Sequence, residues 1–245
     1  MAEVIISTHG ASFADVVAIA RDGAKVVISK ESLAAMQKSR DHVEALAASD
    51  TPVYGISTGF GALANRHVST DLRTQLQRSL IRSHAAGVGA PVEVEVVRAL
   101  MALRLKTLAS GRTGVRPIVA ETMAAILNAG ITPLVREFGS LGCSGDLAPL
   151  AHCALVLMGE GEAVGKDGLA KPVAQLLKAA GIEPVQLAEK EGLALINGTD
   201  GMLGMLILAI HDLRTLVDSA DVVAAMSVEG LLELFVMRIH AHKPS

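Results

Sequence analysis

Aromatic side chains are scarce in this sequence of 245 residues. It contains four phenylalanines, one tyrosine and no tryptophan, so that aromatic residues make up only 2% of the chain. Hydrophobic residues nevertheless make up 51% and charged residues 19%, which excludes a chain that is disordered throughout. Alanine, leucine and valine must therefore fill the core, and small side chains of this kind favour closely packed helices. The length is that of one or two domains.

Other absences limit the possible partners. The net charge is −3 and no run of basic residues occurs, which argues against nucleic acid. The two cysteines, Cys143 and Cys153, are not expected to pair, which favours a reduced, cytoplasmic setting. No basic region precedes an apolar one at the N-terminus, so no signal peptide is predicted. The most apolar stretch, residues 201–210, is too short to span a bilayer, so no membrane is expected.

Apolar residues at helical spacing account for most of the chain. Short strands are expected near the N-terminus, and a hairpin between Glu160 and Lys171. A helix that starts at Thr70 is predicted to turn Leu72, Leu76 and Leu80 inward.

Pro91 is predicted to open a long helix in its first turn, with an apolar stripe on one side. Arg98 and Arg104 are assigned to solvated or interface faces of this helix.

A glycine-rich loop that runs into a helix, residues 139–152, is the main functional candidate. Asp146 is expected to cap this helix, so Ser144 and Gly145 lie where the helix dipole is positive. The spacing of glycine and serine is not the G-x-S-x-G of hydrolases. From the residues alone, a plain polar loop before a helix is an equally good interpretation.

Three further residues stand out, each with a simple structural explanation. Tyr54 lies in a glycine-rich loop, where a tyrosine is most often a surface or hinge residue. His84 lies near a helix end, where free carbonyl groups can satisfy it. Asn197 precedes Gly198 and is typical of a turn. Asp200, shortly after it, is given no role of its own.

Four segments nevertheless resemble the histidine and aromatic amino acid ammonia-lyases, and they occur in that family's order. They are the loop at 139–152, the Y-G-x-x-T-G-F-G motif that starts at Tyr54, residues 76–84, and the E-G-L-A-L-x-N-G-T motif that contains Asn197. The resemblance implies a mainly α fold of the fumarase/aspartase-like helical superfamily, with a few short strands. Residues 1–200 would form the N-terminal domain, and residues 201–245 the beginning of a central helical bundle.

In that family a small residue, a serine and a glycine cyclise and lose water to form a methylidene-imidazolone group (MIO). The resemblance implies that Cys143, Ser144 and Gly145 form this group here, with cysteine in place of the usual alanine. Ser144 would supply the methylidene carbon, and Gly145 the nitrogen that attacks the Cys143 carbonyl. Neither a metal nor a diffusible cofactor is implied.

The resemblance also implies roles around this group. Tyr54 becomes a candidate acid or base, and Asn197 a hydrogen-bonding residue beside the prosthetic group. His84 becomes the substrate-binding residue, because it can exchange a hydrogen bond with an imidazole, whereas a phenyl ring offers no partner. The implied reaction converts L-histidine into trans-urocanate and ammonia.

The resemblance covers about the N-terminal half of the family's architecture. The other half supplies an arginine, a second tyrosine and a glutamate in the family, so the activity of this chain by itself is open. One alternative is a non-catalytic fragment that acts as an assembly partner. Another MIO-dependent ammonia-lyase or aminomutase is a lesser alternative, against which His84 argues. Family members are homotetramers whose active sites draw on three subunits, so a homo-oligomer is expected.

Overall fold

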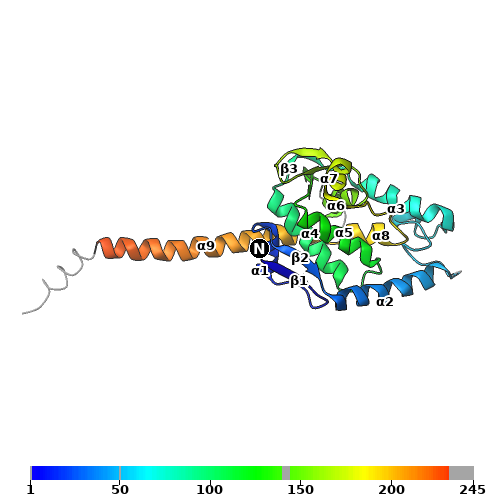
Figure 1. Ribbon diagram of the computed structural model, residues 1–245, viewed down its shortest axis with the longest axis horizontal. Helices are drawn as coiled ribbons and strands as arrows, with labels where there is room; N and C mark the ends of the chain where they lie inside the picture. The colour runs from blue at the N-terminus through cyan, green and yellow to red at the C-terminus, as the bar shows by residue number, and fades with distance from the viewer. Residues whose placement is uncertain (1, 50, 140–143, 232–245) are drawn as a thin grey trace, which may run out of the picture. The chain divides into compact units, whose positions relative to one another are not determined.

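Helices dominate the computed structural model, which describes residues 2–49, 51–139 and 144–231 (Figure 1). The helices are α1 (Phe13–Ala20), α2 (Lys30–Ala47), α3 (Thr70–His84), α4 (Val94–Ala109), α5 (Pro117–Asn128), α6 (Leu147–Leu157), α7 (Val173–Ala180), α8 (Glu191–Ile196) and α9 (Asp200–Gly230), with a 3-10 turn, η1, at Gly61–Leu63. The strands are β1 (Glu3–Ile6), β2 (Lys25–Ile28), β3 (Val88–Pro91), β4 (Thr132–Pro133), β5 (Arg136–Phe138), β6 (Glu162–Val164) and β7 (Ala170–Pro172). The prediction of a mainly helical fold with a few short strands is confirmed.

The chain divides into two compact units, with the boundary between Met205 and Leu206. The described residues up to Met205 are called the body, and residues 206–231 the distal segment.

Capping residues explain where several helices begin and end. Ser12 and Asp15 exchange side-chain and backbone hydrogen bonds at the start of α1, which is the reciprocal pair of a capping box. The Ser29 hydroxyl accepts a hydrogen bond from the Ser32 N–H and thereby caps α2. Pro117 occupies the first turn of α5, where a missing N–H costs nothing. Gly181 ends α7 with a left-handed φ of 66°.

Helix α4 forms the centre of the body. It packs against α1, α2 and α5 and against strands β1 and β4. Its core residues include Leu100, Met101, Leu105 and Leu108, none of which is more than 2% exposed. Alanine, leucine, isoleucine, valine and methionine fill the interior almost alone, as the scarcity of aromatic residues predicts.

Three small sheets are present in the described residues. Strands β1 and β2 pair in parallel, β6 and β7 form a hairpin that β4 extends, and β3 pairs with β5 in antiparallel fashion. The predicted hairpin is thus confirmed, whereas β3, β4 and β5 were missed.

Two sequence predictions are wrong at helix edges. Pro91 ends strand β3, where it is paired with Arg136, and α4 begins only at Val94. A proline is tolerated at such a sheet edge because its missing N–H is not needed there. Of the three leucines predicted to face inward from α3, Leu80 is buried, Leu76 is half-buried and Leu72 is 49% exposed. Arg73, Gln77 and Ile81 complete the buried side of this helix.

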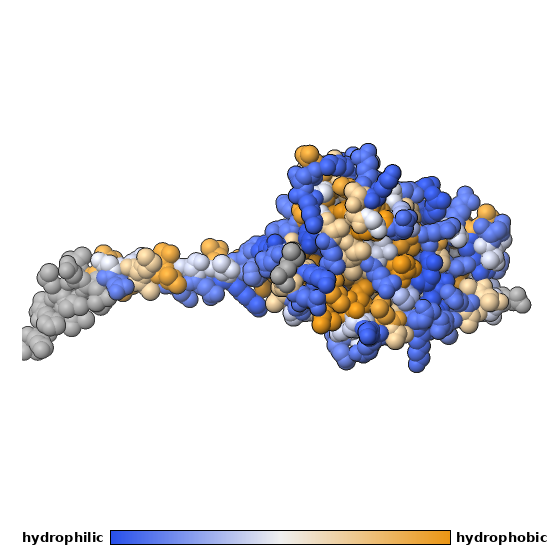
Figure 2. All heavy atoms as spheres, viewed as in Figure 1, coloured by the Kyte–Doolittle hydropathy of each residue, from blue (hydrophilic) through white to orange (hydrophobic). Residues whose placement is uncertain are grey.

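The distal segment continues α9 and exposes many apolar side chains (Figure 2). They are Leu206, Leu213, Leu216, Val217, Val222, Val223, Met226, Val228 and Leu231. By length and composition, one part of the described chain, Glu191–Gly230, could cross a membrane. This is weak support for a membrane protein, because apolar helices of soluble proteins pass the same test.

Candidate active site

The turn that leads into α6 holds two of the predicted reactive residues. Ser144 lies in this turn, and its Oγ is buried without a hydrogen-bond partner in the described part of the chain. Gly145 follows with a φ of +80°, a left-handed conformation that side chains disfavour. Cys143, the first residue of the predicted tripeptide, lies outside the described residues.

The Asp146 carboxylate binds a different helix from the one that the sequence predicts. Asp146 stands at the N-cap of α6 but makes no side-chain hydrogen bond to that helix. Its Oδ2 accepts hydrogen bonds from the N–H groups of Gly201 and Met202 in the first turn of α9, at 2.8 and 3.2 Å. Those groups have no partner within their own helix. Burial raises the pKa of the Asp146 carboxyl, and the two N–H bonds oppose this shift.

Arg104 lies inside the body, and not on the solvated or interface face that was predicted. Its side chain is only 2% exposed. Nη1 donates to the carbonyl oxygens of Ala194 and Asn197 at 3.0 and 3.3 Å, and Nη2 donates to the Asp200 carboxylate. Arg98 is buried as well, so the prediction is wrong for both arginines. Carbonyl and carboxylate oxygens accept hydrogen bonds from both Nη groups of Arg104, which offsets the cost of burying most of its donors. Its buried Nε has no hydrogen-bond partner among the described residues.

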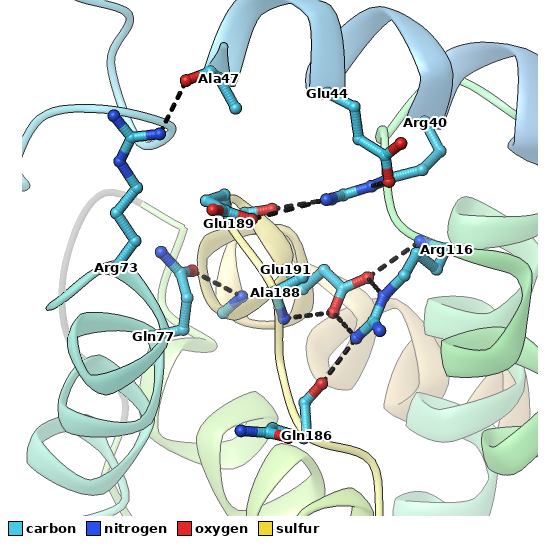
Figure 3. A network of polar contacts seen from close by, with 11 residues as sticks. Arg40, Glu44, Ala47, Arg73, Gln77, Arg116, Gln186, Ala188, Glu189 and Glu191 are labelled. Carbon is cyan, nitrogen blue, oxygen red and sulfur yellow. Dashed lines mark hydrogen bonds and ion pairs between the residues drawn. The ribbon is translucent and has the colours of Figure 1, made fainter. Parts of the chain in front are cut away.

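Buried polar contacts also hold the start of α8, a helix of six residues (Figure 3). The fully buried Glu191 carboxylate accepts hydrogen bonds from Arg116 Nε and Nη2, at 2.8 and 2.7 Å. It also accepts from the backbone N–H groups of Arg116 and Ala188. The Gly192 N–H donates to Gln77 Oε1 of α3 at 2.9 Å. Helix α8 is therefore fixed at its first turn by α3 and by the residue that precedes α5.

Asn197 lies at the other end of α8, at the C-terminal cap, with φ −98° and ψ 96°. The residue is exposed, while its carbonyl group is held by Arg104. The backbone position of Asn197 therefore depends on the buried Arg104, whereas the Asn197 side chain is accessible.

His84 is the half-buried last residue of α3. Its Nδ1 lies 2.9 Å from the Leu80 carbonyl oxygen and 3.0 Å from Ser83 Oγ. In the tautomer that donates from Nδ1 to the carbonyl, Nε2 is an acceptor. Three residues further on, the Gly87 N–H donates to His152 Nε2 of α6 at 3.1 Å. The segment after His84 is therefore hydrogen-bonded to α6.

Tyr54 lies in a turn and is 51% exposed. Its hydroxyl accepts a hydrogen bond from the Gly61 N–H at 3.4 Å, and its ring meets Phe60 edge-on at a centroid distance of 6.1 Å. A Cβ on the neighbouring Gly55 would come within 2.9 Å of Leu193. The Tyr54 loop therefore lies directly against α8.

The structure brings the predicted segments to the same set of helices. Helices α3, α6 and α8, which carry or adjoin His84, Ser144 and Asn197, pack against one another. No hydrogen bond joins these side chains to one another or to Tyr54 within the described residues. A cavity of about 160 Å³ lies beside Asp146, with mostly apolar walls. No cluster of histidine, cysteine or carboxylate side chains in the described ranges is suited to a metal ion.

Four polar residues around these segments were not predicted to be part of the site: the buried Arg104, Glu191 and Asp200 and the half-buried His152. A signal was available for Arg104, which stands seven residues after Val97 and three after Met101, on the apolar stripe of α4. The burial of Asp200 and of Glu191, the first residue of the E-G-L-A-L-x-N-G-T motif, has no comparable signal, since their partners lie 96 and 75 residues away along the chain.

Known proteins with similar sequences and structures support the family resemblance of the sequence and the mainly helical fold. The sequence profile of the family described as aromatic amino acid lyase matches residues 11–245. Histidine ammonia-lyase of Streptomyces griseus is 62% identical, over all of this chain and 48% of that protein. The crystal structure of tyrosine aminomutase from Streptomyces globisporus matches 94% of this chain and 43% of its own, with a TM-score of 0.86 and 41% identity. Histidine ammonia-lyase from Trypanosoma cruzi matches 98% of this chain and 47% of its own, with a TM-score of 0.85 and 33% identity.

The chain belongs to the aromatic amino acid lyase family. It spans about half the length of the curated relatives that it matches. This family of lyases is MIO-dependent, and the described residues of the loop fit the group. A buried hydroxyl without a partner is costly to keep, so Ser144 suits a position whose hydroxyl is removed by dehydration. The left-handed Gly145 suits a backbone that turns back on itself.

Proposed function

We propose that this chain carries the N-terminal half of a histidine ammonia-lyase, which converts L-histidine into trans-urocanate and ammonia. The buried, unpartnered hydroxyl of Ser144 next to the left-handed Gly145 is the observation that carries the proposal. The 62% identity with the Streptomyces griseus enzyme supports it. His84 supports histidine as the substrate, because its free ring nitrogen can exchange a hydrogen bond with an imidazole.

In this reaction a C–N bond breaks, the neighbouring carbon loses a proton and a C=C bond forms. The MIO group from Cys143, Ser144 and Gly145 supplies an electrophilic carbon that makes the amino group a better leaving group. His84 orients the substrate ring through Nε2. Asn197 holds polar groups at the reacting end through its exposed side-chain amide. Tyr54 is our candidate for proton transfer, because its hydroxyl is accessible.

We further propose a cytoplasmic homo-oligomer, a tetramer as in the family, with neither a metal nor a diffusible cofactor and with no nucleic acid or membrane as partner. Residues 1–200 would form the domain that carries the MIO loop, and residues 201–245 would begin the helical bundle. The exposed apolar side chains of the distal segment support an assembly through this helix.

A second candidate function rests on the same exposed side chains. A chain with so much uncovered apolar surface can serve as an assembly partner without catalytic activity of its own. A third candidate, a lyase or aminomutase for another aromatic amino acid, is favoured by the 41% identity with the tyrosine aminomutase structure.

Intact mass and product formation test these candidates. The purified chain is expected to be lighter than its sequence by two waters, and the Ser144→Ala variant is expected to lose none. After addition of the separately expressed C-terminal half of the Streptomyces griseus relative, L-histidine should yield the absorbance of urocanate. L-tyrosine should yield no product.

Each result decides between the candidates. An undehydrated wild-type chain that forms no urocanate contradicts the proposed function. Dehydration without urocanate in the complemented protein favours the assembly partner. Turnover of L-tyrosine in preference to L-histidine favours the third candidate.

A further inference from the structure

We infer that Arg104 is a positioning residue that holds Asn197 and the Ser144 turn in a fixed relation to each other. The inference rests on the proposed function, because it assigns Arg104 to that same site. Arg104 is not itself in reach of a substrate, since its side chain is only 2% exposed. Its effect must therefore pass through the residues that it binds.

The turn after α8 surrounds the guanidinium group. Arg104 donates to the carbonyls of Ala194 and Asn197 before the turn, and to the Asp200 carboxylate after it. A Cβ atom on Gly198, in the middle of the turn, would overlap both Arg104 Nη2 and the Asp200 carboxylate. Only glycine allows the turn to close this tightly around the arginine.

The same contact reaches the Ser144 turn through the start of α9. Asp200 is the first residue of α9, and the two N–H groups that follow it, of Gly201 and Met202, donate to Asp146. Asp146 is two residues after Ser144. Arg104 is therefore connected to both the Asn197 turn and the Ser144 turn through direct hydrogen bonds and residues adjacent in sequence.

The chemistry of arginine is needed for this arrangement. The guanidinium has a planar fork that can bind a carboxylate and two carbonyl groups at once, whereas an ammonium is a point charge on a flexible stem. Burial lowers the pKa of Arg104 and the charge of Asp200 raises it, but a guanidinium stays protonated in proteins in any case. Lysine at this position would keep the charge and lose the fork.

Arg98 is a matched control on the same helix. It is also buried, and it donates to the carbonyl oxygens of Ile19 and Leu127. These acceptors belong to α1 and α5, and neither α8 nor the start of α9 is among the partners of Arg98. Replacement by lysine removes a buried fork in both cases, but only at position 104 does the fork hold the candidate site.

The test compares Arg104→Lys with Arg98→Lys in the full chain. In Arg104→Lys, amide hydrogen exchange at residues 194–202 should be faster by about tenfold or more, because a charged hydrogen-bond donor is lost there. The dehydrated fraction of the chain should fall severalfold. After complementation, kcat should fall about tenfold with little change in KM, since the lost contact positions groups for the reaction and does not bind substrate.

Both lysine variants should lower the melting temperature to a similar extent. Arg98→Lys should leave the hydrogen exchange at residues 194–202, the dehydrated fraction and kcat at their wild-type levels. Asp200→Asn, which keeps the size of the side chain, should shift them in the same direction as Arg104→Lys and by less. If Arg104→Lys does not fold, Asp200→Asn serves as the test variant in its place.

Equal behaviour of the two lysine variants overturns the inference. It is also overturned if exchange becomes faster in Arg104→Lys while dehydration and kcat stay unchanged. An undehydrated and inactive wild-type protein contradicts the proposed function instead, and is recognised before any variant is made.

Discussion

The body and the distal segment use the same residue types in opposite ways. Leu105 and Leu108 in the body are fully buried, whereas Leu213 and Leu216 in the distal segment are 58% and 64% exposed. All four lie on regular helices, so secondary structure does not account for the difference. Contacts with other elements stabilise the body from within, and the apolar surface of the distal segment is available for a partner. The four predictions below test this contrast, and all can be measured by urea unfolding of the chain.

The largest effect is expected for Glu191→Ala in the body. It removes a fully buried carboxylate and leaves Arg116 without its carboxylate partner, which should lower the free energy of unfolding by about 4 kcal/mol. The control is Glu229→Ala in the distal segment, where the side chain is exposed and a change within about 0.5 kcal/mol is expected. Similar losses in both variants would show that the burial of Glu191 is not what matters.

A loss of about 3 kcal/mol is expected for Leu105→Ala, because it removes buried methyl groups and leaves a cavity in the core. Leu216→Ala should change the free energy of unfolding by no more than about 0.5 kcal/mol in this chain. A large loss for Leu216→Ala would mean that the distal segment is already covered, for instance by self-association. Sedimentation at several protein concentrations would detect such an association.

Gly198→Ala should cost about 2 kcal/mol, because its new Cβ overlaps the Arg104 ion pair in a well-packed interior. The same substitution at Gly230, where nothing lies within 4 Å of a new Cβ, should be nearly neutral. Comparable costs at the two glycines would contradict the close approach of the turn to the guanidinium.

The smallest effect concerns His152 and pH. Burial and the charge of Arg136 lower the pKa of His152 below its ordinary value of 6.5. The unfolded chain therefore binds more protons below pH 6.5, so the stability present above that pH is lost as the pH falls through the lower, folded-state pKa. His152→Gln should flatten this part of the stability curve, and exposed His211→Gln should not. An unchanged curve in His152→Gln would assign the acid sensitivity to other groups.

Much of the helical fold depends on local signals in the sequence. The caps at Ser12 and Ser29, the proline that opens α5 and the glycine that ends α7 act over three or four residues, so their effect can be judged without the rest of the chain. The motifs around Ser144 and Asn197 were recognised by their resemblance to a known family.

The sequence predictions were wrong at residues that can contact either a local partner or one that is distant along the chain. Leu72 fits the apolar side of α3 by spacing, but Arg73 and Gln77 are turned inward because the Ala47 carbonyl and the Gly192 N–H need partners there. Asp146 is well placed to cap its own helix, yet its carboxylate caps α9.

The sequence by itself determined most of the helices and several of their ends, because those depend on neighbours along the chain, and its motifs marked the segments that carry the candidate chemistry. Only the tertiary structure decided that Arg104 is buried and that Asp200 and Asp146 are connected to it. A charge can be buried only where distant groups satisfy it, and Asp200 lies 96 residues from Arg104. The packing of the helices brings these two residues into contact, and no short stretch of sequence specifies that packing.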